Sequence, residues 1–174
     1  MNIVLTGFMG TGKTAVGRQL SERLQVPFVD LDALIARKAG RPIAEIFETQ
    51  GEAAFRDLES QLIEEVSSND RTVIATGGGA LLNVKNREIL QRRGLLVCLT
   101  ARVGTLLDRL KDDGTRPLLA GEDLSQRVER LMNERQAVYA QCPIQVATDG
   151  KTIADVTAEI LLKIQPQWQN AQPA

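Results

Sequence analysis

The chain has 174 residues, of which 43% are hydrophobic and 25% are charged, and its net charge is −1. This length suits a single domain that needs no disulfide or structural metal, and the near-zero charge argues against a nucleic-acid-binding protein. The sequence contains no histidine, which excludes Ser-His-Asp catalysis and histidine-based zinc sites.

Short apolar runs alternate with segments of helical periodicity along the whole chain. Strands are predicted at residues 2–6, 27–32, 72–76, 95–100 and 144–148. Helices are predicted at residues 13–24, 31–40, 43–50, 52–68, 84–93, 102–111, 125–140 and 152–164. Five strands interleaved with helices indicate an α/β protein, with a mostly parallel sheet between two layers of helices.

Two segments do not fit this alternation. Residues 112–123, "DDGTRPLLAGED", combine glycine, proline and charge, and are predicted to form a lid. Residues 166–174 are polar and without period, and are predicted to be a disordered tail after a single domain at 1–165.

No apolar run is long enough to span a bilayer. The first strand begins at once, with no charged leader before it. Of the two cysteines, Cys98 falls inside the apolar run "LLVCLT" and is predicted to pack as a small hydrophobic side chain. These features predict a cytoplasmic protein that does not contact membranes.

The segment "GFMGTGKT" at residues 7–14, here called the phosphate loop, follows the first predicted strand. Its spacing matches the pattern G-x-x-x-x-G-K-[ST], in which glycines let backbone N–H groups turn toward a phosphate. Lys13 can reach the β- and γ-phosphates, and Thr14 can offer its hydroxyl to Mg²⁺. The predicted ATP-binding residues here are Gly10, Thr11, Gly12, Lys13, Thr14 and Ala15.

Two further clusters follow predicted strands and should meet the phosphate loop at the carboxyl edge of the sheet. Asp30 and Asp32 share a face if the strand continues through Asp32, whereas a turn would separate their roles, and either could cap the next helix. The three glycines of "TGGGA", Gly77 to Gly79, cost more backbone entropy than a plain turn requires, which favours close approach of a ligand.

Three arginines are candidates for binding an anionic group. Arg56 lies in "FRDLE", where pairing with Glu52 or Glu59 on a solvated helix is the simpler interpretation. Arg116 lies in the predicted lid, and Arg135 lies in "NERQAVY" on the following helix. Arginines so placed can bind a carboxylate through two N–H groups or neutralise a transferring phosphate.

The motifs GFMGTGKT, VDLDALI, FRDLE, TGGGA, TRPLLAG and NERQAVY together resemble the shikimate kinase family, in order and spacing, over about residues 1–165. The resemblance implies a P-loop kinase fold with strand order 2-3-1-4-5 and a mobile lid. It also implies phosphorylation of the 3-hydroxyl of shikimate by ATP with Mg²⁺, in chorismate and aromatic amino-acid synthesis, by a chain expected to be a monomer.

The resemblance also implies roles for single residues. Lys13, Asp32 and Arg116 would be catalytic, and Arg109 would stack on adenine while Arg116 approaches the phosphates. Shikimate would be bound by Asp32, Arg56, Gly77, Gly78, Gly79 and Arg135. Thr14 and Asp30 would hold the metal ion. Met9, Phe47 and Phe55 would form the apolar side of the pocket.

Two alternatives remain at this point. A related small-molecule kinase, such as a gluconate kinase, would share the phosphate loop and the size. A nucleotide-binding homologue without catalytic activity would share the fold, since fold does not guarantee chemistry.

Overall fold

The computed structural model of the chain describes residues 1–111 and 123–170. Arg116 and nearly all of the predicted lid lie outside the described residues. The elements in chain order are β1 (Asn2–Gly7), α1 (Lys13–Leu24), β2 (Phe28–Asp30), α2 (Leu31–Ala39), α3 (Ile43–Ser67), β3 (Val73–Ala75), the 3₁₀ helix η1 (Ala80–Leu82), α4 (Val84–Arg93), β4 (Gly94–Thr100), α5 (Val103–Leu110), α6 (Leu124–Tyr139), β5 (Ile144–Ala147) and α7 (Ile153–Asn170).

The five strands form one parallel sheet in the order β2-β3-β1-β4-β5, which confirms the predicted order. β1 lies at the centre, where Ile3 is in register with Val73 of β3 and Leu95 of β4. Both faces of this strand are buried, because helices connect each parallel strand to the next. The phosphate loop therefore begins at the centre of the sheet.

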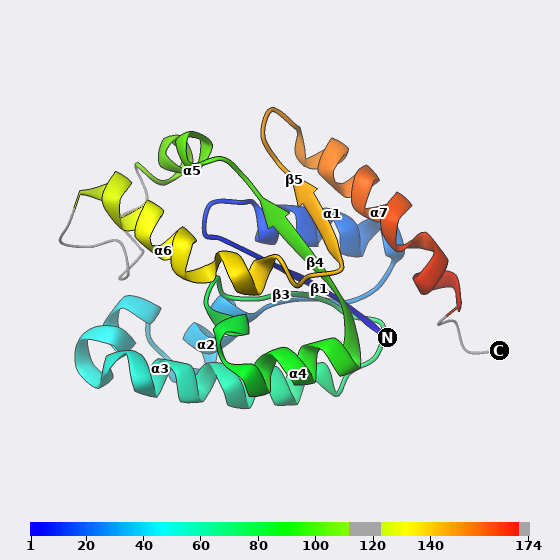
Figure 1. Cartoon of the computed structure of the whole chain (residues 1–174). Helices are drawn as coiled ribbons and strands as arrows, with labels where there is room; N and C mark the ends of the chain where they lie inside the picture. Colours follow the sequence, from blue (N-terminus) through cyan, green and yellow to red (C-terminus); the bar gives the residue numbers. More distant parts are fainter. Residues whose placement is uncertain (112–122, 171–174) are drawn as a thin grey trace.

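Alternate side chains of the sheet belong to two separate cores, so the fold has three layers (Figure 1). Ile3 and Leu5 pack with residues of α1 and α7, whereas Val4 packs with residues of α2, α3 and α4. The predicted α/β/α arrangement is confirmed. None of the helices in the described ranges is both long enough and apolar enough to cross a bilayer.

The second strand is shorter than predicted. β2 ends at Asp30, and α2 begins at Leu31 because the Asp30 carboxylate accepts a hydrogen bond from the backbone N–H of Ala33 and caps the helix. The prediction that the strand runs to residue 32 is wrong. Asp32 lies in the first turn of α2, so the two aspartates belong to different elements.

α3 is divided where the sequence predicts two helices, at residues 43–50 and 52–68. Gly51 has a φ of 81° and interrupts the helix, a conformation that glycine adopts without steric cost. On either side of this break the rings of Phe47 and Phe55 contact each other, with their centroids 4.9 Å apart.

The predicted disordered tail is wrong for residues 166–170, which continue α7. Trp168 is only 7% exposed and extends an apolar stripe of residues spaced four apart, which also holds Val156, Ile160 and Ile164. The Arg71 guanidinium lies over the Trp168 ring, 4.6 Å from its centroid. Packing against the sheet therefore holds a segment whose composition suggests disorder.

Candidate active site

A cavity of about 950 Å³ opens at the carboxyl ends of β1, β2 and β3. It brings together the phosphate loop, both aspartates, Arg56, the three glycines, Arg109 and Arg135. The apolar side predicted for the pocket is also present, formed by Met9, Phe47 and Phe55. The volume is in the range of small-molecule sites.

The phosphate loop is held in place by its own residues. Gly12 takes a left-handed conformation with φ of 90° and precedes the first residue of α1. The ammonium group of Lys13 donates to the carbonyl oxygens of Gly7 and Phe8, both at 2.9 Å. The N-terminal end of α1 thus points into the cavity beside a lysine, an arrangement suited to phosphate.

Of the described residues predicted to bind ATP, Thr11 is the one that does not line the cavity. Its hydroxyl donates to the Phe8 carbonyl at 2.7 Å, and its side chain is buried. Its backbone N–H bonds to the same carbonyl at 3.4 Å. Thr11 therefore shapes the loop and does not face the space where a ligand would lie.

Thr14 and Asp30, predicted to hold a metal ion, lie side by side at the cavity wall. The Thr14 hydroxyl donates to the Asp30 carboxylate at 2.6 Å, while the other carboxylate oxygen caps α2. A hydroxyl and a carboxylate are oxygen donors of the kind that Mg²⁺ prefers. The donor set therefore fits the predicted ion.

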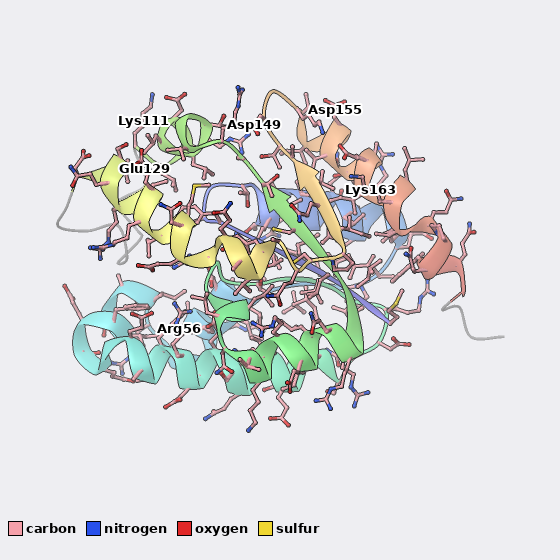
Figure 2. All side chains as sticks on the ribbon, viewed as in Figure 1. Arg56, Lys111, Glu129, Asp149, Asp155 and Lys163 are labelled. Carbon is pink, nitrogen blue, oxygen red and sulfur yellow. The ribbon has the colours of Figure 1, made fainter. Side chains whose placement is uncertain are left out.

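Arg109 joins three segments at the other end of the cavity. Its guanidinium donates to the Gly10 carbonyl and to the carbonyl and hydroxyl oxygens of Thr148, at 3.0–3.1 Å. Next to it, Asp149 accepts hydrogen bonds from the Arg102 backbone and the Thr105 hydroxyl at the start of α5 (Figure 2). The loop after β5 is thereby fixed beside the phosphate loop.

Each glycine of the 77–79 segment gives room to charged side chains. A β-carbon at Gly77 would lie 2.7 Å from a Glu59 carboxylate oxygen and 3.0 Å from an Asp32 carboxylate oxygen. At Gly78 it would lie 3.1 Å from Arg135 Nη1, and at Gly79 it would lie 2.7 Å from Arg56 Nη2. Close approach was predicted from these glycines, and in the structure the approaching groups are the protein's own site residues.

Arg56 projects from α3 toward α6 (Figure 2) and makes two ion pairs. Its Nη1 donates to Glu59 at 2.7 Å, and its Nε and Nη2 donate to Glu52 at 3.2 and 3.0 Å. The pairing expected of a helix-surface arginine is thus present, although Arg56 also lines the cavity. Burial opposes the charged form, but the adjacent carboxylates raise the pKa of Arg56 above its ordinary value.

Arg135 lies on α6 and lines the same cavity as Arg56. We call Arg56 and Arg135 together the arginine clamp. Its side chain is only 2% exposed, and its guanidinium lies over the Phe8 ring, 5.4 Å from the centroid. Within the described residues, its Nε and Nη1 are buried without a hydrogen-bond partner. Because an unsatisfied buried charged donor is costly, these nitrogens point to an anionic ligand as their partner.

Glu59 is a site residue that the sequence reasoning did not select. Its carboxylate is 1% exposed, lines the cavity and has one oxygen without a partner among the described residues. Burial raises the pKa of Glu59, and the nearby Asp32 raises it further, while Arg56 and Arg135 lower it. The available signal was its position on the buried face of α3, among Phe55, Leu62 and Val66.

The arrangement matches known proteins in sequence and in structure. A family model described as shikimate kinase matches residues 9–165. A shikimate kinase from Symbiobacterium thermophilum is 48% identical over 172 residues, which cover 97% of this chain and 99% of that protein. The chain belongs to the shikimate kinase family.

Solved structures of shikimate kinases have the same fold. The enzyme from Acinetobacter baumannii, in complex with shikimate, superposes with a TM-score of 0.92 at 40% identity, covering 95% of this chain and 93% of that one. A gluconokinase from Sinorhizobium meliloti reaches a TM-score of 0.64 at 18% identity, which is a likeness of fold alone. The family therefore favours shikimate kinase over the gluconate kinase alternative.

Proposed function

We propose that this chain transfers the γ-phosphoryl group of ATP to the 3-hydroxyl of shikimate, giving shikimate 3-phosphate and ADP in chorismate and aromatic amino-acid biosynthesis. The observation that carries the proposal is Arg135, which lines the same cavity as the phosphate loop and has two buried nitrogens without a partner among the described residues. A carboxylate-bearing acceptor would supply the missing partner, within reach of a bound nucleotide.

The arginine clamp would hold the shikimate carboxylate. Arg135 offers two N–H-bearing nitrogens that have no partner in the part of the chain that the structure describes. Arg56 is kept charged by Glu52 and Glu59, which between them occupy three of its N–H groups and leave others to bind a ligand. Planar guanidinium groups suit such a carboxylate because they can donate two parallel hydrogen bonds.

Asp32 would orient the attacking hydroxyl. In the proposed reaction the hydroxyl oxygen bonds to the γ-phosphorus, the bond from that phosphorus to the bridging oxygen breaks, and ADP leaves. The Asp32 carboxylate accepts a hydrogen bond from the hydroxyl and can take up its proton. Phosphoryl transfer depends mainly on positioning and charge stabilisation, so a single carboxylate suffices without histidine.

The phosphate loop would bind the nucleotide's phosphates, with Lys13 moving from the Gly7 and Phe8 carbonyls to the phosphate oxygens. Thr14 and Asp30 would hold Mg²⁺, which when bound neutralises charge on the β- and γ-phosphates. Arg109 would contact the adenine, from its place beside Thr148. The catalytic role of Arg116 stays a prediction.

The test is an ADP-release assay with ATP and Mg²⁺, run with shikimate, with gluconate and without an acceptor. We expect ADP release to depend on shikimate, with gluconate no better than the blank. Binding of both ligands without turnover would instead support the non-catalytic alternative. The monomeric state and cytoplasmic location also stay predictions, and light scattering coupled to size-exclusion chromatography would test the first.

A further inference from the structure

Tyr139 connects two parts of the candidate site without lining the cavity itself. It is the last residue of α6, and its hydroxyl donates to the backbone carbonyl of Gly78, which lies 61 positions earlier in the chain. The hydrogen bond is 2.5 Å long. A side chain on α6 thus fixes the backbone of the glycine segment that follows β3.

The Arg135 guanidinium lies one turn earlier on α6, and its Nη1 is close to the same glycine, 3.1 Å from where a β-carbon of Gly78 would lie. The Tyr139 hydroxyl therefore occupies a backbone carbonyl that lies beside the clamp arginine. Burial raises the pKa of Tyr139, so the hydroxyl keeps its proton and its donor function at neutral pH.

The hydrogen bond from Tyr139 to Gly78 determines which acceptors are open to the Arg135 guanidinium. The Arg135 guanidinium lies over the Phe8 ring, and the Gly78 carbonyl beside it is already occupied by the Tyr139 hydroxyl. With the Tyr139 hydroxyl in place, Nε and Nη1 have no hydrogen-bond partner within residues 1–111 and 123–170, and a ligand can supply one. Without it, the guanidinium could rotate and use those nitrogens on the vacated Gly78 carbonyl, since Nη1 already lies beside Gly78.

We propose that Tyr139 is a positioning residue for the acceptor's carboxylate, occupying the Gly78 carbonyl so that the neighbouring Arg135 guanidinium keeps its nitrogens for a ligand. The inference rests on the proposed function, because it names how that site recognises an acid. Tyr139 acts through Arg135 and does not touch the reacting atoms. Its effect should therefore fall on acceptor binding, with phosphoryl transfer nearly unchanged.

The first experiment is Tyr139→Phe, which removes one oxygen and keeps the ring. We expect the KM for shikimate to rise about 3- to 10-fold, the loss of one hydrogen bond. The kcat and the KM for ATP should stay within about twofold of the wild type. The matched control is Thr157→Val on α7, which removes another buried hydroxyl-to-carbonyl bond, of 2.8 Å, and should change neither KM.

Two additions separate positioning from a general structural role. A shikimate analogue with a carboxamide in place of the carboxylate should bind the wild type and Tyr139→Phe equally. In an Arg135→Lys background, Tyr139→Phe should raise the KM by less than about twofold, because interacting residues are not additive. An unchanged KM in Tyr139→Phe, or equal losses for the acid and the amide, would overturn the inference.

A measurement on the unmodified chain covers the case in which the variant does not fold. Tyr139 is the only tyrosine in the sequence, so labelling tyrosine Cζ with ¹³C gives a single NMR signal from the carbon that bears this hydroxyl. We expect that signal to shift on saturation with shikimate and not with the carboxamide analogue. A signal that shikimate leaves unchanged would contradict the proposal. If the wild type neither binds nor phosphorylates shikimate, the proposed function fails; normal turnover with an unaffected Tyr139→Phe variant refutes the inference alone.

Discussion

The phosphate loop and the arginine clamp line the same cavity, but they are built in different ways. The loop is one run of eight residues whose polar side chains, those of Thr11, Lys13 and Thr14, already have partners in the protein. The clamp joins two helices far apart in the sequence, and Arg135 has buried nitrogens without partners in the described residues. The loop therefore keeps its conformation through its own contacts, without a ligand. The clamp, in contrast, has buried donors that await an anionic partner.

This difference predicts where mutations act. Changes in the phosphate loop should remove interactions that are stronger in the transition state, and so lower kcat. Changes in the clamp should remove contacts that the bound acceptor makes throughout the reaction, and so raise its KM.

The largest effect is expected from Lys13→Met, which removes the charge beside the transferred phosphoryl group. We expect kcat to fall by about 10³- to 10⁵-fold, the range for loss of a cation that stabilises this transition state. Steady-state ADP release measures it, with nucleotide binding followed separately. A kcat close to that of the wild type would contradict the prediction that changes in the phosphate loop lower kcat.

Asp32→Asn tests the residue that lies between the two regions. We expect kcat to fall by about 10²- to 10⁴-fold, the usual contribution of a positioned proton acceptor. The dissociation constant for ATP should change little, because Asp30 and Thr14 remain. A variant that loses ATP affinity and keeps its kcat would move Asp32 to the nucleotide side of the cavity.

Arg56→Ala tests the clamp itself. We expect the KM for shikimate to rise about 10- to 150-fold, from loss of a hydrogen bond to a charged group worth about 1.5–3 kcal/mol. The KM for ATP serves as the internal control and should not move. An unchanged KM for shikimate would mean that Arg56 is only the partner of Glu52 and Glu59.

The smallest effect concerns stability and uses Glu59→Gln. Burial raises the pKa of Glu59 above its ordinary value of 4.5 in the folded state. The folded chain therefore releases this proton at a higher pH than the unfolded chain does. This contribution to the unfolding free energy is complete below pH 4.5 and is lost as the pH rises through the folded pKa.

Denaturant unfolding of the wild type and of Glu59→Gln over a pH series would show this slope in the difference between them, at most about 1.4 kcal/mol per pH unit for one proton. Glu48→Gln, at an exposed position of the same helix, controls for the loss of one carboxylate. A difference that grows in the wild type's favour as the pH rises would contradict the argument.

The fold was predictable because its signals are local. Helix α1 and helix α4 have the predicted bounds, and the five strands alternate with helices as the apolar runs indicate. Asp30 was less certain, because it could extend a strand or cap a helix, and only the hydrogen bond from Ala33 decides between these. Trp168 falls in the predicted disordered tail, because its neighbours in the sequence are polar. The groups that bury it come from the sheet and from Arg71, which are distant in the sequence.

The sequence by itself determined the phosphate loop, the layered sheet and the family, because each depends on residue types at short, fixed spacing. Only the tertiary structure decided that Glu59 is buried beside Asp32, that Tyr139 reaches Gly78, and that Arg135 keeps two nitrogens without a partner among the described residues. The physical reason is that burial and hydrogen bonding between distant segments set the cost of a charge, and neither can be read from the order of residues along one helix.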